Sequence, residues 1–584
     1  MIAGMHIRLL ALSPLAALLA SCAAAPPMAE QAGMPAVPPV EIGIIAINDF
    51  HGNLEPPRRA VSMPGPDGET IRVPAGGAAW LASAVDQLRA RHAHTLTVSA
   101  GDLTSASQLS SSLFLDEPTV GVMNRIALDF NAVGNHEFDR GWQELQRLQN
   151  GGCAQLAARQ PCAVEPEFPG ANYRYLAANV DLPGGVPLFP GSALRHFGEG
   201  DRRVAIGLIG LTLKDTPTLV SPSGVAGLTF GDEAEAINSA TGVLKRAGAD
   251  AVVVLIHEGI ATGGEPDPNS CVDPQGALAP ILDRLDPRVD LVISGHTHRS
   301  YVCTWSDAAG TKDILLSSAG SYGTLVTDIT LQIDPVSGTV VSKRAVNVPV
   351  QSEPFRDVTL TNAVTAFAPR ADVAEYVATY VGAAAQFATR PAGRLAGLAR
   401  KDSANGGALG RLIADAQLAA TQDAGAQIAL MNPGGIRADL APQPDGSVLF
   451  GDIYAVQPFD NTLVTLTLTG AQLLAVLEGQ TDRADPVIFA VSDGFGFAYD
   501  LSRPAGNRIS AVTLNGAPID PAAAYRVTVN SFLSTGGDGF TLFNEGTDRT
   551  VGMADLAALE AWLQADPPRA APAQPRVRSL GPAN

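Results

Sequence analysis

Residues 42–52 read IGIIAINDFHG, an apolar run that ends in two side chains of the kind that bind metal ions, Asp49 and His51. Four later stretches have the same form, in which a strand-like apolar run leads into potential ligands. The chain has only 9 histidines in 584 residues, and five of them occur in these five stretches. Core packing does not require such a placement, so the pattern indicates a metal site. The four later motifs are Gly101-Asp102, Gly134-Asn135-His136-Glu137, His257-Glu258 and Gly295-His296-Thr297-His298.

The apolar runs before the motifs predict strands of an α/β fold. Their continuous apolar character is typical of strands buried on both faces, with helices such as residues 78–91 and 233–246 between them. In an open α/β sheet, ligands bind outside the carboxyl ends of the parallel strands, so the side chains that follow these strands converge. The predicted strands are residues 42–47, 95–99, 130–133, 252–256 and 291–294.

The candidate ligands combine carboxylate, imidazole and amide oxygen. This mixture suits zinc, manganese, cobalt or iron(II) rather than a structural zinc bound by thiolates. Seven candidates are too many for one tetrahedral ion, whereas two ions bridged by one carboxylate would use all of them. Paired ions of that kind drive in-line displacement at phosphorus.

Together these motifs resemble the calcineurin-like metallophosphoesterases, and among them the 5'-nucleotidase family. The resemblance rests on NDFHG at 48–52, GD at 101–102, GNHEFD at 134–139 and GHTH at 295–298. It implies two divalent ions, whose identity among zinc, manganese, cobalt and iron stays open. Asp102 would bridge two ligand sets, which are Asp49, His51, Asp102 and His298 for one ion and Asp102, Asn135, His257 and His296 for the other.

The resemblance also implies a catalytic pair. His136 matches the histidine that stabilises charge on the phosphoryl group or the leaving oxygen, and Asp139, one helical turn later, would orient and charge it.

Two other histidines provide a contrast. His92 and His94 have the same His-x-His spacing as His296 and His298 but precede a strand, so we expect them at the opposite edge of the sheet, in solvent.

A second group of motifs, after residue 390, matches the family's C-terminal domain. Asn432-Pro433-Gly434-Gly435-Ile436-Arg437 offers a backbone that an anion can approach and a guanidinium that can bind phosphate. By resemblance, Arg411 would be another substrate arginine, and Arg394 or Arg400 would add a third positive charge. Each motif is weak alone because glycine-rich turns and helix-end arginines are common.

Two phenylalanines match the pair that sandwiches the nucleobase in this family. Phe459 and Phe532 both lie beside turn residues rather than within periodic apolar runs, which favours a position on loops. Stacking accepts any base and contributes about 1–3 kcal/mol per base. By the same resemblance, Asp538 would bind the ribose hydroxyls, and Asn432 and Asn461 would contact the base or sugar.

The N-terminus predicts export. Residues 1–21 have the short basic start and apolar run of a signal peptide, and Cys22 follows a small-residue cleavage pattern that resembles a bacterial lipobox. We therefore expect cleavage before Cys22, its lipidation, and attachment to the outer membrane facing the periplasm, or a free periplasmic protein if the cysteine is incidental. Four cysteines then remain, an even number in an exported chain. The local pairings are Cys153 with Cys162 and Cys271 with Cys303, although the sequence alone allows three arrangements.

The predicted architecture is α/β with two domains. An N-terminal four-layer metallophosphoesterase β-sandwich flanked by helices is joined by a helical linker to a smaller α/β nucleotidase domain. The expected segments are a signal peptide (1–21), a flexible spacer (22–39), the first domain (40–350), a linker with a helix at about 372–387 (351–392), the second domain (393–565) and a flexible Pro/Ala-rich tail (566–584). With 46% hydrophobic residues, the chain can bury more than one core.

The net charge of −19, from 58 acidic and 39 basic residues, argues against a nucleic-acid polymer as partner. A small phosphate ester is different, because bound cations reverse the local potential. The predicted function is hydrolysis of nucleoside 5'-monophosphates, and of UDP-sugars or other nucleotides, for nucleotide catabolism or salvage. Two alternatives stay open: a 2',3'-cyclic-nucleotide phosphodiesterase with 3'-nucleotidase activity, and a non-catalytic nucleotide-binding lipoprotein. The sequence leaves the oligomeric state open.

Overall fold

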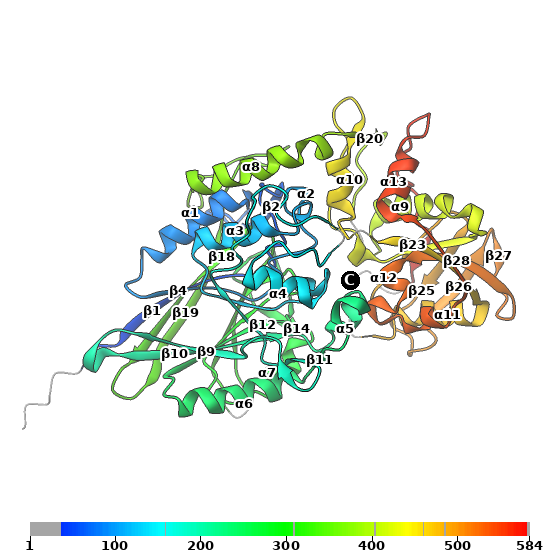
Figure 1. Cartoon of the computed structure of the whole chain (residues 1–584). Coiled ribbons are helices and arrows are strands. Elements are labelled where there is room, and N and C mark those ends of the chain that lie inside the picture. Colours follow the sequence, from blue (N-terminus) through cyan, green and yellow to red (C-terminus); the bar gives the residue numbers. More distant parts are fainter. Residues whose placement is uncertain are drawn as a thin grey trace, which may run out of the picture.

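The computed structural model describes residues 37–580, except 158, 308–309, 402–404, 460 and 484–485. The predicted signal peptide, Cys22 and most of the predicted spacer therefore lie outside the described residues. The first part of the described chain forms the larger body, and the remainder forms a smaller body packed against it (Figure 1).

Two six-stranded sheets face each other in the larger body. Residues of both sheets, such as Ile44 and Val98 from one and Val253 and Leu291 from the other, share one apolar cluster. The first sheet has the order β19-β18-β1-β4-β5-β6 and the second β16-β17-β15-β12-β10-β9. The strands are β1 (Val40–Ile47), β4 (Thr95–Ser99), β5 (Phe130–Ala132), β6 (Arg174–Leu176), β18 (Leu325–Asp334) and β19 (Thr339–Pro349), and β9 (Ser192–Phe197), β10 (Val204–Thr212), β12 (Ala251–His257), β15 (Leu291–Ser294), β16 (Ser300–Trp305) and β17 (Ile314–Ala319).

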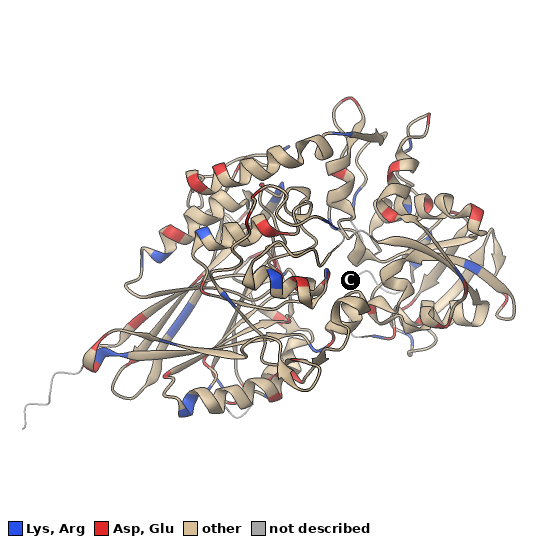
Figure 2. Cartoon of the chain, viewed as in Figure 1, with Lys and Arg blue, Asp and Glu red and all other residues tan. Residues whose placement is uncertain are grey.

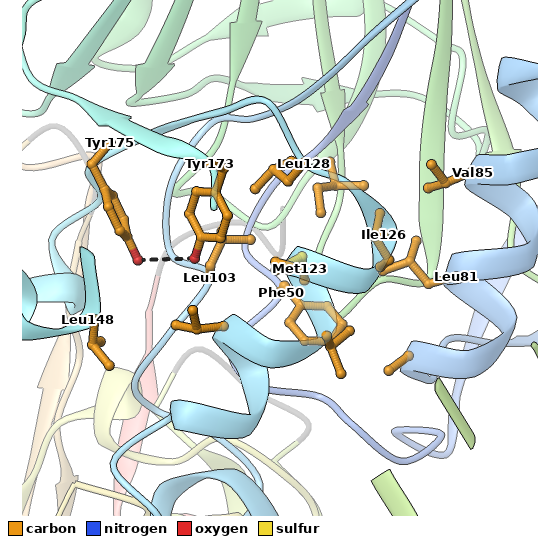
Figure 3. Packing of buried hydrophobic residues seen from close by; sticks show 14 of the residues in the cluster. Phe50, Leu81, Val85, Leu103, Met123, Ile126, Leu128, Leu148, Tyr173 and Tyr175 are labelled. Carbon is orange, nitrogen blue, oxygen red and sulfur yellow. Dashed lines mark hydrogen bonds between the residues drawn. The ribbon is translucent and has the colours of Figure 1, made fainter. Parts of the chain in front are cut away.

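Helices cover the outer face of each sheet, which completes the predicted four layers (Figure 1). The first sheet is covered by α1 (Ala78–Arg89), α3 (Glu117–Ile126) and α4 (Trp142–Asn150), and the second by α6 (Glu233–Arg246) and α7 (Leu278–Asp283). Helix α8 (Ala371–Ala388) packs on α1 and α3. Figure 3 shows the first of these layers, where Phe50, Leu81, Val85, Met123 and Ile126 pack together. The strands β4 and β15 and the helix α6 have the predicted bounds, and α8 is one residue longer at each end than the predicted linker helix.

The smaller body contains a five-stranded sheet of order β24-β21-β28-β23-β29 and a four-stranded sheet of order β27-β26-β25-β30. Their strands are β21 (Ile428–Met431), β23 (Thr462–Thr469), β24 (Ala490–Val491), β28 (Ala524–Asn530) and β29 (Thr547–Ala554), and β25 (Phe495–Tyr499), β26 (Ile509–Leu514), β27 (Ala517–Pro518) and β30 (Val577–Ser579). The helices are α9 (Gly407–Ala420), α10 (Phe450–Val456), α11 (Gly470–Gly479), α12 (Ser531–Ser534) and α13 (Asp555–Leu563).

The predicted flexible tail is instead part of the second body. Strand β30 pairs in parallel with β25, and Arg576 forms an ion pair with Asp415 at 2.6 Å. Proline and alanine dominate the composition here, but the short Val577–Ser579 segment can still add to an open sheet edge. The expectation of an unstructured segment is therefore wrong for residues 566–580.

His92 is also not in solvent as expected. Its ring contacts Glu41 at 3.0 Å and Asp328 at 2.9 Å, and its side chain is 5% exposed. Burial lowers the pKa of His92, but the two carboxylates outweigh this and raise it above the usual value. Lying at the edge of the sheet opposite the motifs, His92 thus ties β1 to β18.

Both local cysteine pairings are confirmed, because disulfides join Cys153 to Cys162 and Cys271 to Cys303. Among the described residues, no helix combines the length and apolar character needed to cross a membrane. Lysines and arginines are scattered over both bodies in the view of Figure 2.

Candidate active site

The seven candidate ligands come from the carboxyl ends of strands in both sheets of the larger body. Asp49 and His51 follow β1, Asp102 follows β4, and Asn135 follows β5; His257 ends β12, and His296 and His298 follow β15. The sequence pattern predicts that these side chains converge at the edge of one sheet. In the structure they converge where the edges of the two packed sheets meet.

Their ligand atoms meet at close range. Asp102 Oδ2 lies 3.6 Å from His51 Nε2 and 3.0 Å from His257 Nε2, while Asp49 Oδ1 lies 3.3 Å from His298 Nε2. Among the described residues, two clusters could hold a metal ion: Asp49 with His51 and His298, and Asp49 with Asp102 and His257. His296 Nδ1 and Asn135 Oδ1 form a further close contact, at 3.1 Å.

The spacing of Asp49 and His51 follows from the residue between them. Phe50 is fully buried in the apolar cluster between the first sheet and its helices (Figure 3). Its ring anchors the turn in the core, so the side chains before and after it face the site. A Cβ at Gly323 would lie 3.2 Å from the Phe50 ring, which explains the glycine opposite it.

Five of the seven ligands have a backbone conformation that non-glycine residues rarely adopt. Their φ angles are positive: Asp49 (49°), His51 (47°), Asp102 (52°), His296 (70°) and His298 (56°). Each such residue costs about 1–3 kcal/mol and persists only where the surroundings impose it. Accumulated strain of this kind is typical of a functional site.

The imidazoles are oriented for metal binding by backbone carbonyls. His51 Nδ1 lies 2.9 Å from the Ser105 carbonyl and His257 Nδ1 lies 2.8 Å from the Ala100 carbonyl, so in each ring Nδ1 donates and the Nε2 lone pair faces the site. Such contacts are usual for metal-binding histidines. His257 Nε2 is buried without a hydrogen-bond partner among the described residues and faces two carboxylates. A cation at this point satisfies both, so the donor set fits a divalent metal.

Protonation of His257 is the other way to balance the charge of the two carboxylates near its Nε2. Burial lowers the pKa of His257, yet Asp102 and Asp49 outweigh burial and raise it. In contrast, burial and the charge of His257 lower the pKa of His296 to about 4. The raised pKa of His257 reflects the negative charge of Asp102 and Asp49, and bound cations would balance the same charge.

Two residues within the motifs, whose roles the sequence did not indicate, orient the ligands. Asn48 Nδ2 donates to Asp49 Oδ2 at 2.7 Å and to the Gly320 carbonyl at 2.7 Å. Glu137 is buried and accepts hydrogen bonds from the backbone N–H groups of Asp102, Leu103 and Gly134 at 2.7–2.9 Å. In the sequence, the one signal for this role of Glu137 is that a carboxylate follows directly after Asn135-His136.

The predicted catalytic pair is formed. His136 Nδ1 lies 2.8 Å from Asp139 Oδ2, so the carboxylate fixes the ring with Nε2 directed away from it. Burial alone would lower the pKa of His136, but the charges of Asp139 and Asp102 outweigh it and raise the pKa. His136 begins the short helix His136–Phe138, and Asp139 directly follows it. The backbone N–H of His136 donates to Asp102 Oδ1 at 2.9 Å.

A cavity of about 390 Å³ opens between the two bodies beside this pair. The larger body contributes His136, Asp139, Asn135, His296 and the segment 219–221, and the smaller body contributes the predicted substrate-binding side chains. Those side chains are Asn432, Arg437, Phe459, Asn461, Phe532 and Asp538.

Hydrogen bonds between these side chains hold the polar wall of the cavity. Asn432 Nδ2 donates to Asp538 Oδ2 at 2.8 Å, and Asn530 Nδ2 donates to Asn432 Oδ1 at 2.9 Å. Asn461 Oδ1 accepts from the Ser531 hydroxyl and from the Phe532 N–H. Burial raises the pKa of Asp538. Asn432 and Asn461 thus set the positions of the carboxylate and of one aromatic ring.

Arg437 reaches from the smaller body to the ligands of the larger one. One of its terminal nitrogens lies 3.5 Å from His51 Nε2, and its Nε is buried without a hydrogen-bond partner among the described residues. An unsatisfied guanidinium N–H at this place fits an anionic ligand. Two further cations approach it: Lys401 donates to the Ile436 carbonyl and Arg59 donates to the Arg437 carbonyl at 2.8 Å.

Arg411 does not join this group. It is buried on α9 and donates through Nε and a terminal nitrogen to the Pro572 carbonyl, at 3.1 and 2.7 Å. Arg400 lines a separate cleft with Arg72 and Arg356, and Arg394 donates to the Asp445 carbonyl. The positive charges near Arg437 are therefore Lys401 and Arg59, and no glycine-rich motif marks either of them in the sequence.

Two family models match the chain. Calcineurin-like phosphoesterase matches residues 42–300, and 5'-nucleotidase, C-terminal domain, matches residues 381–545. Among solved structures, a 5'-nucleotidase precursor from Thermus thermophilus is similar, with a TM-score of 0.73 and 26% identity over 92% of this chain and 99% of that one.

Curated relatives differ in how much of their length is matched. A "Probable 5'-nucleotidase" of Treponema pallidum is 26% identical over 86% of this chain and 88% of its own length. The cell wall protein Lmo0130 of Listeria monocytogenes is 30% identical over 87% of this chain, which spans 64% of that relative. An uncharacterised protein of Acinetobacter calcoaceticus is 50% identical over 161 residues, 27% of this chain and 79% of that relative.

Proposed function

Because the chain belongs to the 5'-nucleotidase family of calcineurin-like phosphoesterases, we propose that it releases phosphate from nucleoside 5'-monophosphates. It is a metal-dependent phosphoric monoester hydrolase. One observation carries the substrate assignment: the cavity beside His136 and the metal-ligand cluster is lined by an arginine, two phenylalanines and an aspartate from the other domain. Those groups suit a phosphate, a base and a ribose, respectively.

The ions would be held by the carboxylate, imidazole and amide groups of the seven ligands, with Asp102 between the two sets. When bound, two divalent ions supply charge stabilisation and lower the pKa of water. The protein's own groups divide the remaining work. Arg437 would bind the phosphoryl oxygens, and His136, held by Asp139, would stabilise charge as it develops on the phosphoryl group or the leaving oxygen.

The base and sugar would be recognised by the smaller domain. Phe459 and Phe532 would stack on the two faces of the base, which tolerates different bases, and Asp538 would accept hydrogen bonds from the ribose hydroxyls. Because the cavity walls belong to two domains, the domains would have to separate for substrate to enter. Closure would then exclude bulk water, but not the attacking water, before the chemical step.

The protein acts outside the cytoplasm in this proposal. Both disulfides are formed, which is typical of exported chains, and a relative is a cell wall protein. We further propose that Cys22 is acylated and that the chain is attached to the outer membrane through this lipid. Mass analysis of the mature N-terminus from a membrane fraction tests the anchor, and an unmodified residue at that position would reject it.

The test of function uses the chain from Ala23 onwards, prepared free of metal and resupplied with manganese, zinc or cobalt. Phosphate release is measured from AMP, UDP-glucose, 2',3'-cyclic AMP and p-nitrophenyl phosphate. His136→Ala is compared with His196→Ala. His196 is an exposed histidine on β9 that belongs to none of the site motifs, so its replacement serves as the control.

Metal-dependent release from AMP that His136→Ala abolishes and His196→Ala retains supports the proposal. Preference for the cyclic nucleotide would instead assign the cyclic phosphodiesterase activity of the same family. Absence of release from every substrate with every metal, while AMP still binds, would leave a nucleotide-binding lipoprotein.

A further inference from the structure

The ring of Phe459 stacks on the imidazole of His136. Their centroids are 5.8 Å apart and their planes differ by 21°, a near-parallel arrangement. His136 belongs to the larger domain and Phe459 to the smaller one, so this contact crosses the domain boundary beside the cavity.

The contact restricts a motion of His136 that its other partners leave free. Asp139 fixes the direction of Nδ1 through one hydrogen bond, but a ring held at a single atom can still tilt about that bond. His51 contacts the ring edge-on, with centroids 5.1 Å apart and planes at 74°. Among the described aromatic pairs, Phe459 alone lies near-parallel to a face of this imidazole.

Phe459 also borders the proposed phosphate ligand. The guanidinium carbon of Arg437 lies 5.7 Å from the centre of the same ring. One aromatic side chain thus touches the group proposed to bind phosphate and the group proposed to stabilise its charge.

Phe532, the other predicted base-stacking residue, packs against its own domain. Its ring lies against Gly537, where an added Cβ would come within 2.6 Å of the ring, and Gly537 belongs to the same domain. Its support is therefore internal to the smaller domain. The two phenylalanines line one cavity, but Phe459 packs on His136 of the larger domain and Phe532 on Gly537 of the smaller one.

We propose that Phe459 is a positioning residue for the chemical step, in addition to any contact with the base. By stacking on His136 it aligns the imidazole when the domains close, so that base binding and catalysis share one side chain. This inference rests on the proposed function. It extends that function by assigning Phe459 an effect on turnover that does not require a base.

The test separates positioning from base recognition by using a substrate without a base. Phe459→Leu and Phe459→Trp are compared with wild type on AMP and on ribose 5-phosphate, with saturating metal. Phe450→Leu is the matched control, because Phe450 is a partly buried phenylalanine of the same domain that contacts Arg390. Thermal unfolding checks that each variant is folded.

We expect Phe459→Leu to lower kcat for ribose 5-phosphate by at least about tenfold, a part of the 10²–10⁴ that a positioned acid–base group contributes. Its KM for ribose 5-phosphate should stay within about twofold, and Phe459→Trp should restore most of kcat because it restores the stack. Phe450→Leu should match wild type.

A Phe459→Leu variant that raises KM for AMP but retains wild-type kcat for ribose 5-phosphate would overturn the inference and leave the proposed function intact. A wild-type protein that hydrolyses neither ester would overturn both. An equal loss of kcat in Phe459→Leu and Phe459→Trp would also reject positioning by an aromatic stack.

Discussion

Gly134 and Asp102 approach so closely that a Cβ at Gly134 would lie 2.2 Å from Asp102 Oδ1. The glycine is therefore required by the ligand beside it. We predict that Gly134→Ala displaces the Asp102 carboxylate and lowers metal affinity and activity by at least about 100-fold, since misplacement of about 1 Å costs that much. Metal content after dialysis and phosphate release from AMP measure the effect.

Gly382→Ala is the control for that substitution. Gly382 lies inside α8, and an added Cβ there meets nothing within 4 Å. Alanine in a helix interior is favoured over glycine by about 1 kcal/mol. The control should retain full activity and unfold at a slightly higher temperature; full activity in Gly134→Ala would contradict the argument.

Asp139 should matter for turnover rather than for metal binding. Asp139→Asn removes the charge that raises the pKa of His136 and allows the wrong tautomer of the ring. We expect kcat for AMP to fall by about 10²–10⁴, with unchanged metal content. Loss of metal in this variant would show that Asp139 supports the ligands instead.

Asn48 should have the opposite profile. Its side-chain amide holds one oxygen of Asp49, and removal of a partner that orients a metal ligand typically costs about 10–100-fold in affinity or activity. Asn48→Ala should therefore weaken metal binding by about that factor and recover activity as metal is added. A titration of activity against manganese distinguishes this outcome from a defect that metal cannot rescue.

The two disulfides should differ in their contribution to stability. Cys271 and Cys303 are 32 residues apart and Cys153 and Cys162 only 9. In the chain-entropy model, the longer loop stabilises the folded protein by about 1 kcal/mol more. Denaturant unfolding of the two paired Cys→Ser variants should show the larger loss for Cys271 with Cys303, and equal losses would contradict the entropic account.

His92 should make stability depend on pH. Since its pKa is raised in the folded state by Asp328 and Glu41 against the effect of burial, its stabilising contribution is complete below the unfolded pKa of about 6.5. The contribution is lost as pH rises through the folded pKa. The stability difference between wild type and His92→Gln should therefore shrink as pH rises from about 6.5 through the raised pKa of the folded state. A difference that grows over this range would show that the ring is neutral when folded.

The convergence of the candidate metal ligands could be predicted from the sequence because their signal is local. Each follows a continuous apolar run, and Asp49 and His51 alternate with a buried Phe50. Strand β4 and helix α6 likewise have the predicted bounds, since an apolar run marks the strand and a helical apolar periodicity marks the helix within the segment itself. Packing of the two sheets brings the ligands together, and the separate motifs do not specify that packing.

Other positions depend on contacts that no local pattern encodes. Arg411 has the residue type of a substrate ligand, but a carbonyl from the C-terminal segment binds it. Lys401 approaches Arg437 only because residues 399–401 run beside residues 436–440. His92 does not lie in solvent as its sequence position suggests, because the carboxylates that bind it lie on β1 and β18.

The left-handed backbone of five candidate ligands has a consequence for the stability of the protein without metal. Five residues with unfavourable φ angles raise the free energy of these loops when no metal holds their side chains. The metal-free protein should therefore unfold at a lower temperature than the metal-bound protein. Binding to the folded state alone stabilises it by RT ln(1 + [L]/Kd), about 2.7 kcal/mol at a hundredfold excess over Kd. The unfolding temperature would then act as a gauge of occupancy, and a melting curve taken across a series of metal concentrations would rank manganese, zinc and cobalt without any substrate.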